Sequence, residues 1–399
     1  MQKRSHISDF NVLPAFTFFA TFCLAFSVFL SFSSENAGVF FYETFYFGQL
    51  ALCVFCLTLN KNAILCFVGR KEGYFTLIGL SVVTLALWNF LITADYLYSI
   101  LIVLSSFVGI VLYLLSATRR TELELILKSL IMLNVGVLMW QYLIYFLSGE
   151  LVYFHSEMFP FSRDRYALTI GDHYARFSGF HLEPGSYANM VALILIFYHR
   201  LVNKIDLFFI VGTLSIVFTF STIGFIMAML LFYCILREIH WNLRKALCLT
   251  CIFACVFFFS QDKAIGIFKE RYFGNRADSS LSYKTKNMDI YLKLPLAEKI
   301  TGVGVEVSAH RDNTLRHLTG NGALFYLIIT LGLLGLSFSL LSLWLASSHG
   351  PTVVTFLILL FVSRYSVIYP AFWAILPSLW MCRGIKAETV RCSKLSTTQ

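Results

Sequence analysis

Charged residues are scarce in this chain of 399 residues. Asp, Glu, Lys and Arg make up 13% of the sequence and hydrophobic residues 58%, whereas soluble domains average about 25% and about 45–50%. The mean hydropathy is +0.74, and the apolar residues are spread along the whole chain. The composition therefore excludes an ordinary soluble domain and predicts an all-α protein that crosses a membrane several times.

The chain also lacks the short motifs that hold a metal ion or a nucleotide. It contains no Asp-x-Asp pair, no His-Glu-x-x-His, no glycine-rich phosphate loop ending in lysine, and no Gly-x-Ser-x-Gly. These absences give no support to an enzyme that uses a nucleotide sugar and a divalent metal. We therefore expect neither a metal nor a cofactor.

The cysteines and the net charge exclude two further classes. None of the ten cysteines lies in the two long polar stretches, 149–185 and 261–319, so no disulfide framework is expected. Cys53-x-x-Cys56 and Cys248-x-x-Cys251 lack polar neighbours and are interpreted as small buried hydrophobes. The net charge of +9 does not indicate nucleic acid, because Lys and Arg lie mainly in short loops between apolar runs.

Apolar runs of spanning length recur along the sequence. A spanning helix needs about 20 apolar residues, and the run that follows Lys3 and Arg4 is interpreted as a first such helix rather than a cleaved signal peptide. About twelve helices are predicted, near 13–33, 40–60, 74–93, 96–117, 125–148, 186–202, 205–220, 222–237, 246–261, 320–345, 351–365 and 367–382.

The distribution of basic residues predicts the orientation of these helices. With both termini in the cytoplasm, 17 of the 31 Lys and Arg residues fall on the inner side, while the short outer loops hold only Arg364. The stretches 149–185 and 261–319 then become two large periplasmic loops of a single membrane domain, 1–399. Few ionisable residues lie within the apolar runs, which is unusual for an ion-coupled transporter.

In the first loop, Arg176, His181 and Glu183 lie just before an apolar run. Pro184 and Gly185 are typical of a helix start, where a carboxylate is favoured by the helix dipole. Glu183 is thus either a capping carboxylate paired with Arg176 or a base that accepts a proton from a sugar hydroxyl. Arg176 is predicted to bind phosphate, because a guanidinium can donate two parallel hydrogen bonds.

In the second loop, Gly302-x-Gly304 precedes a polar segment that runs into the next apolar helix. If 310–318 is helical, His310, Asn313 and His317 share one face, which either faces solvent or faces a substrate. Asp312 and Arg316 form an i, i+4 pair on another face. Arg271 and Arg276 belong to a basic stretch with two interpretations, contact with lipid head groups or binding of a lipid-linked pyrophosphate.

These residues resemble the bacterial O-antigen polymerases, within the O-antigen polymerase and ligase superfamily. The pattern Arg176-Phe-Ser-Gly179 with Glu183-Pro184 resembles that family's first periplasmic loop. Gly302-x-Gly304, then Asp312-Asn313, then Gly332-Leu-Leu-Gly335 resembles the second. O-antigen ligases share the second set but place a histidine directly before the asparagine, where this chain has Asp312.

The resemblance implies a metal-independent glycosyltransferase of the bacterial inner membrane. Such an enzyme polymerises oligosaccharide repeat units linked to undecaprenyl pyrophosphate, on the periplasmic side, in O-antigen or other surface polysaccharide biosynthesis. Glu183 is the first candidate for the base, with His310 and His317 next. The expected substrate ligands are Arg176, Arg271, Arg276, Arg311, Asn313 and Arg316. The expected partners are lipid-linked glycans, membrane lipids and a chain-length regulator, but no nucleic acid. The alternatives are a ligase acting on lipid A-core and a flippase.

Overall fold

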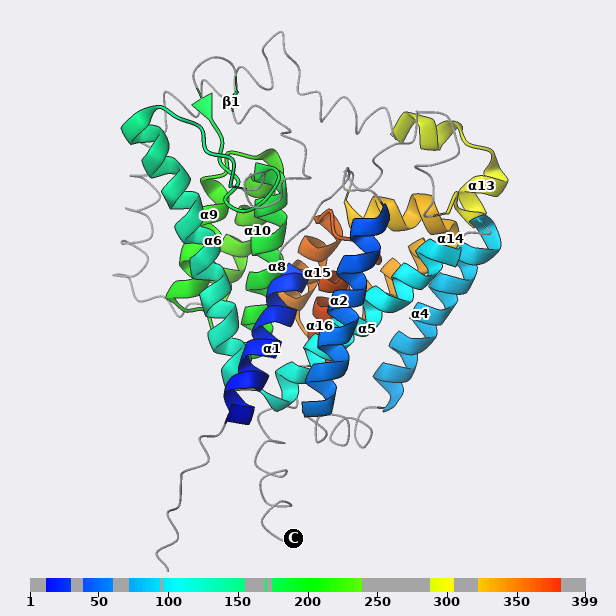
Figure 1. Ribbon diagram of the computed structural model, residues 1–399. Helices are drawn as coiled ribbons and strands as arrows, with labels where there is room; N and C mark the ends of the chain where they lie inside the picture. The colour runs from blue at the N-terminus through cyan, green and yellow to red at the C-terminus, as the bar shows by residue number, and fades with distance from the viewer. Residues whose placement is uncertain are drawn as a thin grey trace, which may run out of the picture.

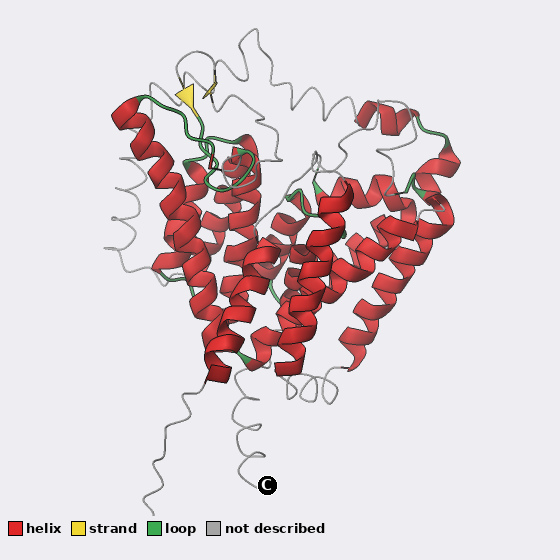
Figure 2. Ribbon diagram, viewed as in Figure 1, coloured by secondary structure: helices red, strands yellow, loops and turns green. Residues whose placement is uncertain are grey.

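The computed structural model describes residues 12–29, 39–59, 72–93, 96–154, 169–170, 174–238, 288–304 and 322–381. This part of the chain is helical apart from short connections and one antiparallel pair, β1 (Thr169–Ile170) with β2 (Tyr174–Ala175) (Figure 2). The helices are α1 (Val12–Phe29), α2 (Val39–Leu59), α4 (Glu72–Thr93), α5 (Tyr96–Thr118), α6 (Arg120–Ser148), α8 (Pro184–Val202), α9 (Leu207–Val217), α10 (Thr222–Glu238), α13 (Leu296–Thr301), α14 (Ala323–Ser347), α15 (Pro351–Val362) and α16 (Pro370–Met381).

The apolar runs located the helices in the part of the chain that the structure describes. Each predicted run contains a helix, except 246–261, which lies outside the described residues. Among the described residues, four spans are long and apolar enough to cross a membrane: Tyr98–Ser116, Arg120–Ser148, Pro184–Val202 and Ala323–Ser347. The runs 205–220, 351–365 and 367–382 form helices of 11 or 12 residues. These reach roughly 17–18 Å, well short of a hydrocarbon core of about 30 Å.

Helix α8 forms the centre of the molecule. Its residues from Pro184 to His199 are all buried, and it contacts α6, α9, α10, α15 and α16. A helix that is apolar on nearly every side is buried either by neighbouring helices or by lipid, and here neighbouring helices surround it. The 19 residues of α8 span about 28 Å, so a central helix runs from one face of the molecule to the other.

The described parts of the two predicted loops lie on the same face. Figure 1 shows α6 rising to the upper left, where β1 lies, and α13 at the upper right, while α1 begins at the lower edge. Residues 149–154 and 174–183 of the first loop and 288–304 of the second therefore lie on one face, opposite the start of α1. This arrangement is compatible with the orientation predicted from the basic residues.

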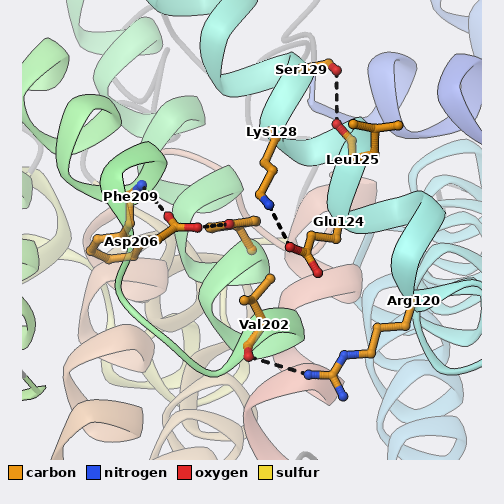
Figure 3. Close-up of polar contacts among 9 residues, drawn as sticks. Arg120, Glu124, Leu125, Lys128, Ser129, Val202, Asp206 and Phe209 are labelled. Carbon is orange, nitrogen blue, oxygen red and sulfur yellow. Dashed lines mark hydrogen bonds and ion pairs between the residues drawn. The ribbon is translucent and has the colours of Figure 1, made fainter.

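Polar side chains tie the helices together on the lower face. Lys128 Nζ lies 2.7 Å from Glu124 Oε1 on α6, and Arg120 Nη2 donates to the Val202 carbonyl at 3.5 Å (Figure 3). Asp206 caps α9 by accepting from the Phe209 amide at 3.2 Å. These contacts fix the turn between α8 and α9 against α6.

A second polar contact on this face joins the end of α8 to the end of α10. His199 Nε2 lies 2.6 Å from Glu238 Oε2, and the histidine side chain is only 2% exposed. The next residue, Arg200, donates from Nε to the Ser378 carbonyl at 3.2 Å. The lower end of α8 is thus held by α10 and α16.

Candidate functional site

The first motif is a loop that α6 holds in place through Gln141. This buried side chain accepts hydrogen bonds from the amides of Ser178 and Gly179, at 3.2 and 2.7 Å, and donates to the Val152 carbonyl at 3.0 Å. One glutamine therefore connects the two described ends of the first loop.

His181 lies inside the protein and not in an exposed site. Its side chain is fully buried, and its Nε2 lies 2.9 Å from Asn134 Oδ1 on α6. Because Asn134 Nδ2 donates to the Leu130 carbonyl, Oδ1 is the acceptor and His181 donates from Nε2. The ring also meets Tyr187 edge-on at 5.6 Å. His181 therefore positions the loop.

Phe177, next to Arg176, anchors the same loop by apolar packing. It is 1% exposed and packs edge-on against Tyr142 and Tyr145, with ring centroids 4.4 and 5.6 Å apart. Arg176 follows β2 directly and is half-buried. The backbone on each side of Arg176 is thus fixed, by β2 before it and by Phe177 after it.

Glu183 occupies the N-cap position of α8, as predicted, but its side chain has a different partner. Its backbone is extended, with φ −145° and ψ 157°, and the carboxylate accepts no capping hydrogen bond. Within the described part of the chain, its ion pair is formed with Arg364. Of the two alternatives for Glu183, the capping carboxylate paired with Arg176 is therefore wrong, because the connection between α15 and α16 brings another arginine to this helix end.

Arg364 is the functional candidate that sequence reasoning missed. Its amide donates to Asn189 Oδ1 at 3.2 Å, and Asn189 Nδ2 donates to the Gly185 carbonyl at 2.6 Å. The side chains of Arg364 and Glu183 are 31% and 20% exposed. One signal was present in the sequence, since Arg364 is the lone basic residue of the short outer loops.

The second motif docks on a break in α14. Gly332 has φ 57° and ψ −133°, which interrupts the helix. The amides of Val303 and Gly304 donate to the carbonyls of Ile329 and Thr330 just before this break, at 3.0 and 2.8 Å. The segment 302–304 thus supplies donors where a helix end leaves carbonyls unsatisfied.

Glycine is required on both sides of this contact. A Cβ at Gly332 would lie 2.2 Å from the Ile300 carbonyl oxygen, and one at Gly302 would lie 2.3 Å from the Thr330 oxygen. A Cβ at Gly335 would lie 2.1 Å from the Leu327 carbonyl oxygen. In a continuous helix, residues eight positions apart are separated by about 12 Å along the axis. The helix predicted over 320–345 is therefore present as α14, but it is interrupted at Gly332, where the chain turns back.

The first half of α14, residues 323–331, connects the two motifs. At its start, the Ala323 amide donates to the Ser363 carbonyl at 2.7 Å, next to Arg364. At its end lies the break at Gly332, beside which the amides of Val303 and Gly304 donate to helix carbonyls. Nine residues of helix cover about 13 Å, and Figure 1 shows this part of α14 on the upper face. The two motifs are therefore neighbours on one face.

The other predicted site residues cannot be placed. His310, His317, Arg271, Arg276, Arg311, Asn313 and Arg316 lie outside the described residues. Most of them belong to the stretch 305–321, which joins Gly304 to Gly322. A Cβ at Gly322 would lie 3.0 Å from the Val362 carbonyl oxygen. Both flanking residues thus belong to the same face. In the described ranges, no group of three or more His, Cys, Asp or Glu side chains is placed to hold a metal ion.

Comparison of the chain with family models, with characterised proteins and with solved structures finds no match.

Proposed function

We propose that this chain is a glycosyltransferase that polymerises lipid-linked oligosaccharide repeat units. It acts at the periplasmic face of a bacterial inner membrane, with both termini in the cytoplasm. Its donor and acceptor are repeat units carried on undecaprenyl pyrophosphate. The proposal combines the resemblance of the two motifs with their positions in the described part of the chain.

The observation that carries the proposal is the proximity of the two motifs. They are far apart in the sequence, yet the first half of α14 connects them over about 13 Å, through Ser363 at one end and Val303 and Gly304 at the other. An arginine and a carboxylate that are partly exposed lie at one end of this connection. A reaction that must bind a pyrophosphate and remove a proton needs these two groups close together.

The proposed chemistry needs one base and a cationic site. The acceptor hydroxyl attacks the anomeric carbon of the donor glycan, and its proton passes to Glu183. The bond between that carbon and the pyrophosphate oxygen breaks, and the pyrophosphate leaves with the electron pair. Arg176 stabilises the leaving group by charge-assisted hydrogen bonds. A positioned base contributes roughly 10²–10⁴-fold to such a step.

The second loop supplies the remaining predicted groups. His310 and His317 are the alternative bases, and Asn313 is a predicted glycan ligand. The arginines of the loop, Arg271, Arg276, Arg311 and Arg316, are the predicted pyrophosphate ligands. A chain-length regulator would act on the polymer that leaves the site.

The purified chain in lipid nanodiscs, supplied with one synthetic lipid-linked repeat unit, tests the proposal. We expect a ladder of products that differ by one repeat unit, and its loss in Glu183→Gln. The matched control is Glu238→Gln, which removes a carboxylate at the opposite end of the bundle and should leave the ladder intact.

Two other outcomes would replace the proposal. Transfer of a single glycan to lipid A-core, without a ladder, would identify a ligase. Movement of the lipid-linked unit across the bilayer, without any new glycosidic bond, would identify a flippase. A deletion in cells separates these cases, because loss of a polymerase leaves core that carries one repeat unit, whereas loss of a ligase or a flippase leaves none.

A further inference from the structure

The ion pair of Glu183 and Arg364 joins two elements at the upper face. Glu183 precedes α8, and Arg364 follows α15. Both side chains are partly exposed, at 20% and 31%, so an ion arriving from outside can reach them. The pair lies against Gly185, where a Cβ would stand 3.6 Å from Arg364 Nη2 and 3.6 Å from Glu183 Oε1.

The backbone that carries Arg364 is rigid. Its amide is bound by Asn189, whose own amide group is bound to α8. The preceding carbonyl, of Ser363, accepts from Ala323 at the start of α14. The backbone of Arg364 is therefore held where three helices meet, and loss of the contact with Glu183 would not displace it.

Glu183 is held less firmly than Arg364. Its carboxylate makes no cap bond to the first amides of α8, and its contact with Ser186 Oγ is long, at 3.5 Å. The first amides of a helix lack partners within the helix and favour an anion. If the carboxylate turned away, it would leave the guanidinium beside the start of a helix. These two groups together favour a phosphate over a carboxylate, because a phosphate carries more negative charge.

We propose that Arg364 binds the pyrophosphate of the lipid-linked donor, and that Glu183 occupies this place when no donor is bound. This inference rests on the proposed function and adds Arg364 to its substrate ligands. On binding, the pyrophosphate displaces the Glu183 carboxylate from the guanidinium. Glu183 then lies beside the reacting carbon with no cation attached, free to accept the proton of the acceptor hydroxyl, while Arg364 holds the leaving pyrophosphate.

The test measures binding of pyrophosphate without any glycosyl transfer. Inorganic pyrophosphate and farnesyl pyrophosphate are titrated into the purified full chain in neutral-lipid nanodiscs, by calorimetry. Arg364→Gln should weaken binding about tenfold or more, since a charge-assisted bond is lost, and Arg364→Lys should weaken it less. Glu183→Gln should bind severalfold tighter, because the competing carboxylate is gone.

Matched controls come from the opposite end of α8. Arg200→Gln and Glu238→Gln remove one charge each on the lower face and should leave pyrophosphate binding unchanged. The thermal midpoint of each variant establishes that it is folded, and Glu183→Asp serves as the second variant if Glu183→Gln unfolds. A shorter carboxylate should also compete less and bind pyrophosphate more tightly.

Three results would overturn the inference. Unchanged binding in Arg364→Gln would remove Arg364 from the ligands, and equal or weaker binding in Glu183→Gln would remove the displacement. If phosphatidylglycerol nanodiscs abolish binding of both probes, the site takes lipid head groups instead. The proposed function fails separately, if the repeat-unit assay gives no ladder while pyrophosphate binding follows the expected pattern.

Discussion

Two neutral polar side chains of α6 hold the loop that carries Arg176 and Glu183. Asn134 and Gln141 are seven residues apart on α6, which places them on one face of the helix. They bind the His181 ring and the amides of Ser178 and Gly179. Polar groups inside a membrane helix need such partners, so these two residues give the loop a single position.

We expect Asn134→Leu to lower the stability of the protein by about 1–3 kcal/mol, because it leaves the buried His181 donor unsatisfied. The measurement is the thermal midpoint in detergent. Adding His181→Phe to Asn134→Leu should recover part of the loss, since both polar partners are then gone. A single variant as stable as the parent chain would contradict this account of His181.

Arg176→Ala should abolish long glycan chains in cells while the amount of protein stays constant. In the proposed mechanism, this change removes a permanent cation next to the leaving pyrophosphate. Chain length is read on a gel of the cell-surface polysaccharide. Arg120→Ala, which removes a cation of α6 on the lower face, is the control and should keep full chain length. Normal chain length in Arg176→Ala would exclude it from the site.

At the scale of elements, the break in α14 and the segment 302–304 form one unit. Gly332→Ala should destabilise this unit, because φ is +57° and the new Cβ would lie 2.2 Å from a backbone oxygen. Strain of this kind costs about 1–3 kcal/mol, and we expect a lower thermal midpoint and loss of polymer.

The control for Gly332→Ala is Gly79→Ala on α4, where a Cβ meets nothing within 4 Å. Alanine at a helical position of that kind stabilises by roughly 0.5–1 kcal/mol. Opposite shifts of the thermal midpoint in the two variants are the expected result. Equal shifts would mean that the break at Gly332 has no special requirement for glycine.

The helices could be predicted from the sequence, whereas the break in α14 and the partner of Glu183 could not. Apolar runs locate helices because each helix must bury or embed its side chains, so α5, α6 and α8 were found within a few residues. The break at Gly332 was not found, because its run is apolar throughout and a glycine alone does not end a helix. The partner of Glu183 was also missed, since pairing with Arg364 depends on tertiary packing, which a local sequence pattern does not encode.

At the scale of the whole molecule, α8 carries a polar pair at each end. Glu183 meets Arg364 on the upper face, and His199 meets Glu238 on the lower face. The length of α8, about 28 Å, is close to the thickness of a hydrocarbon core, about 30 Å. The two pairs would thus lie near opposite surfaces of a membrane, and only the upper one faces the motif loops.

This arrangement predicts which residues are accessible from each side. Glu150, after α6, and Lys204, between α8 and α9, are both exposed and lie near opposite ends of the bundle. A membrane-impermeant maleimide added to intact spheroplasts should label Glu150→Cys, whereas Lys204→Cys should react only after lysis. The parent chain, treated in the same way, measures the background from its native cysteines. Labelling of Lys204→Cys in intact spheroplasts, with Glu150→Cys protected, would invert the topology and place Glu183 and Arg364 on the cytoplasmic side, where a periplasmic polymerase has no substrate.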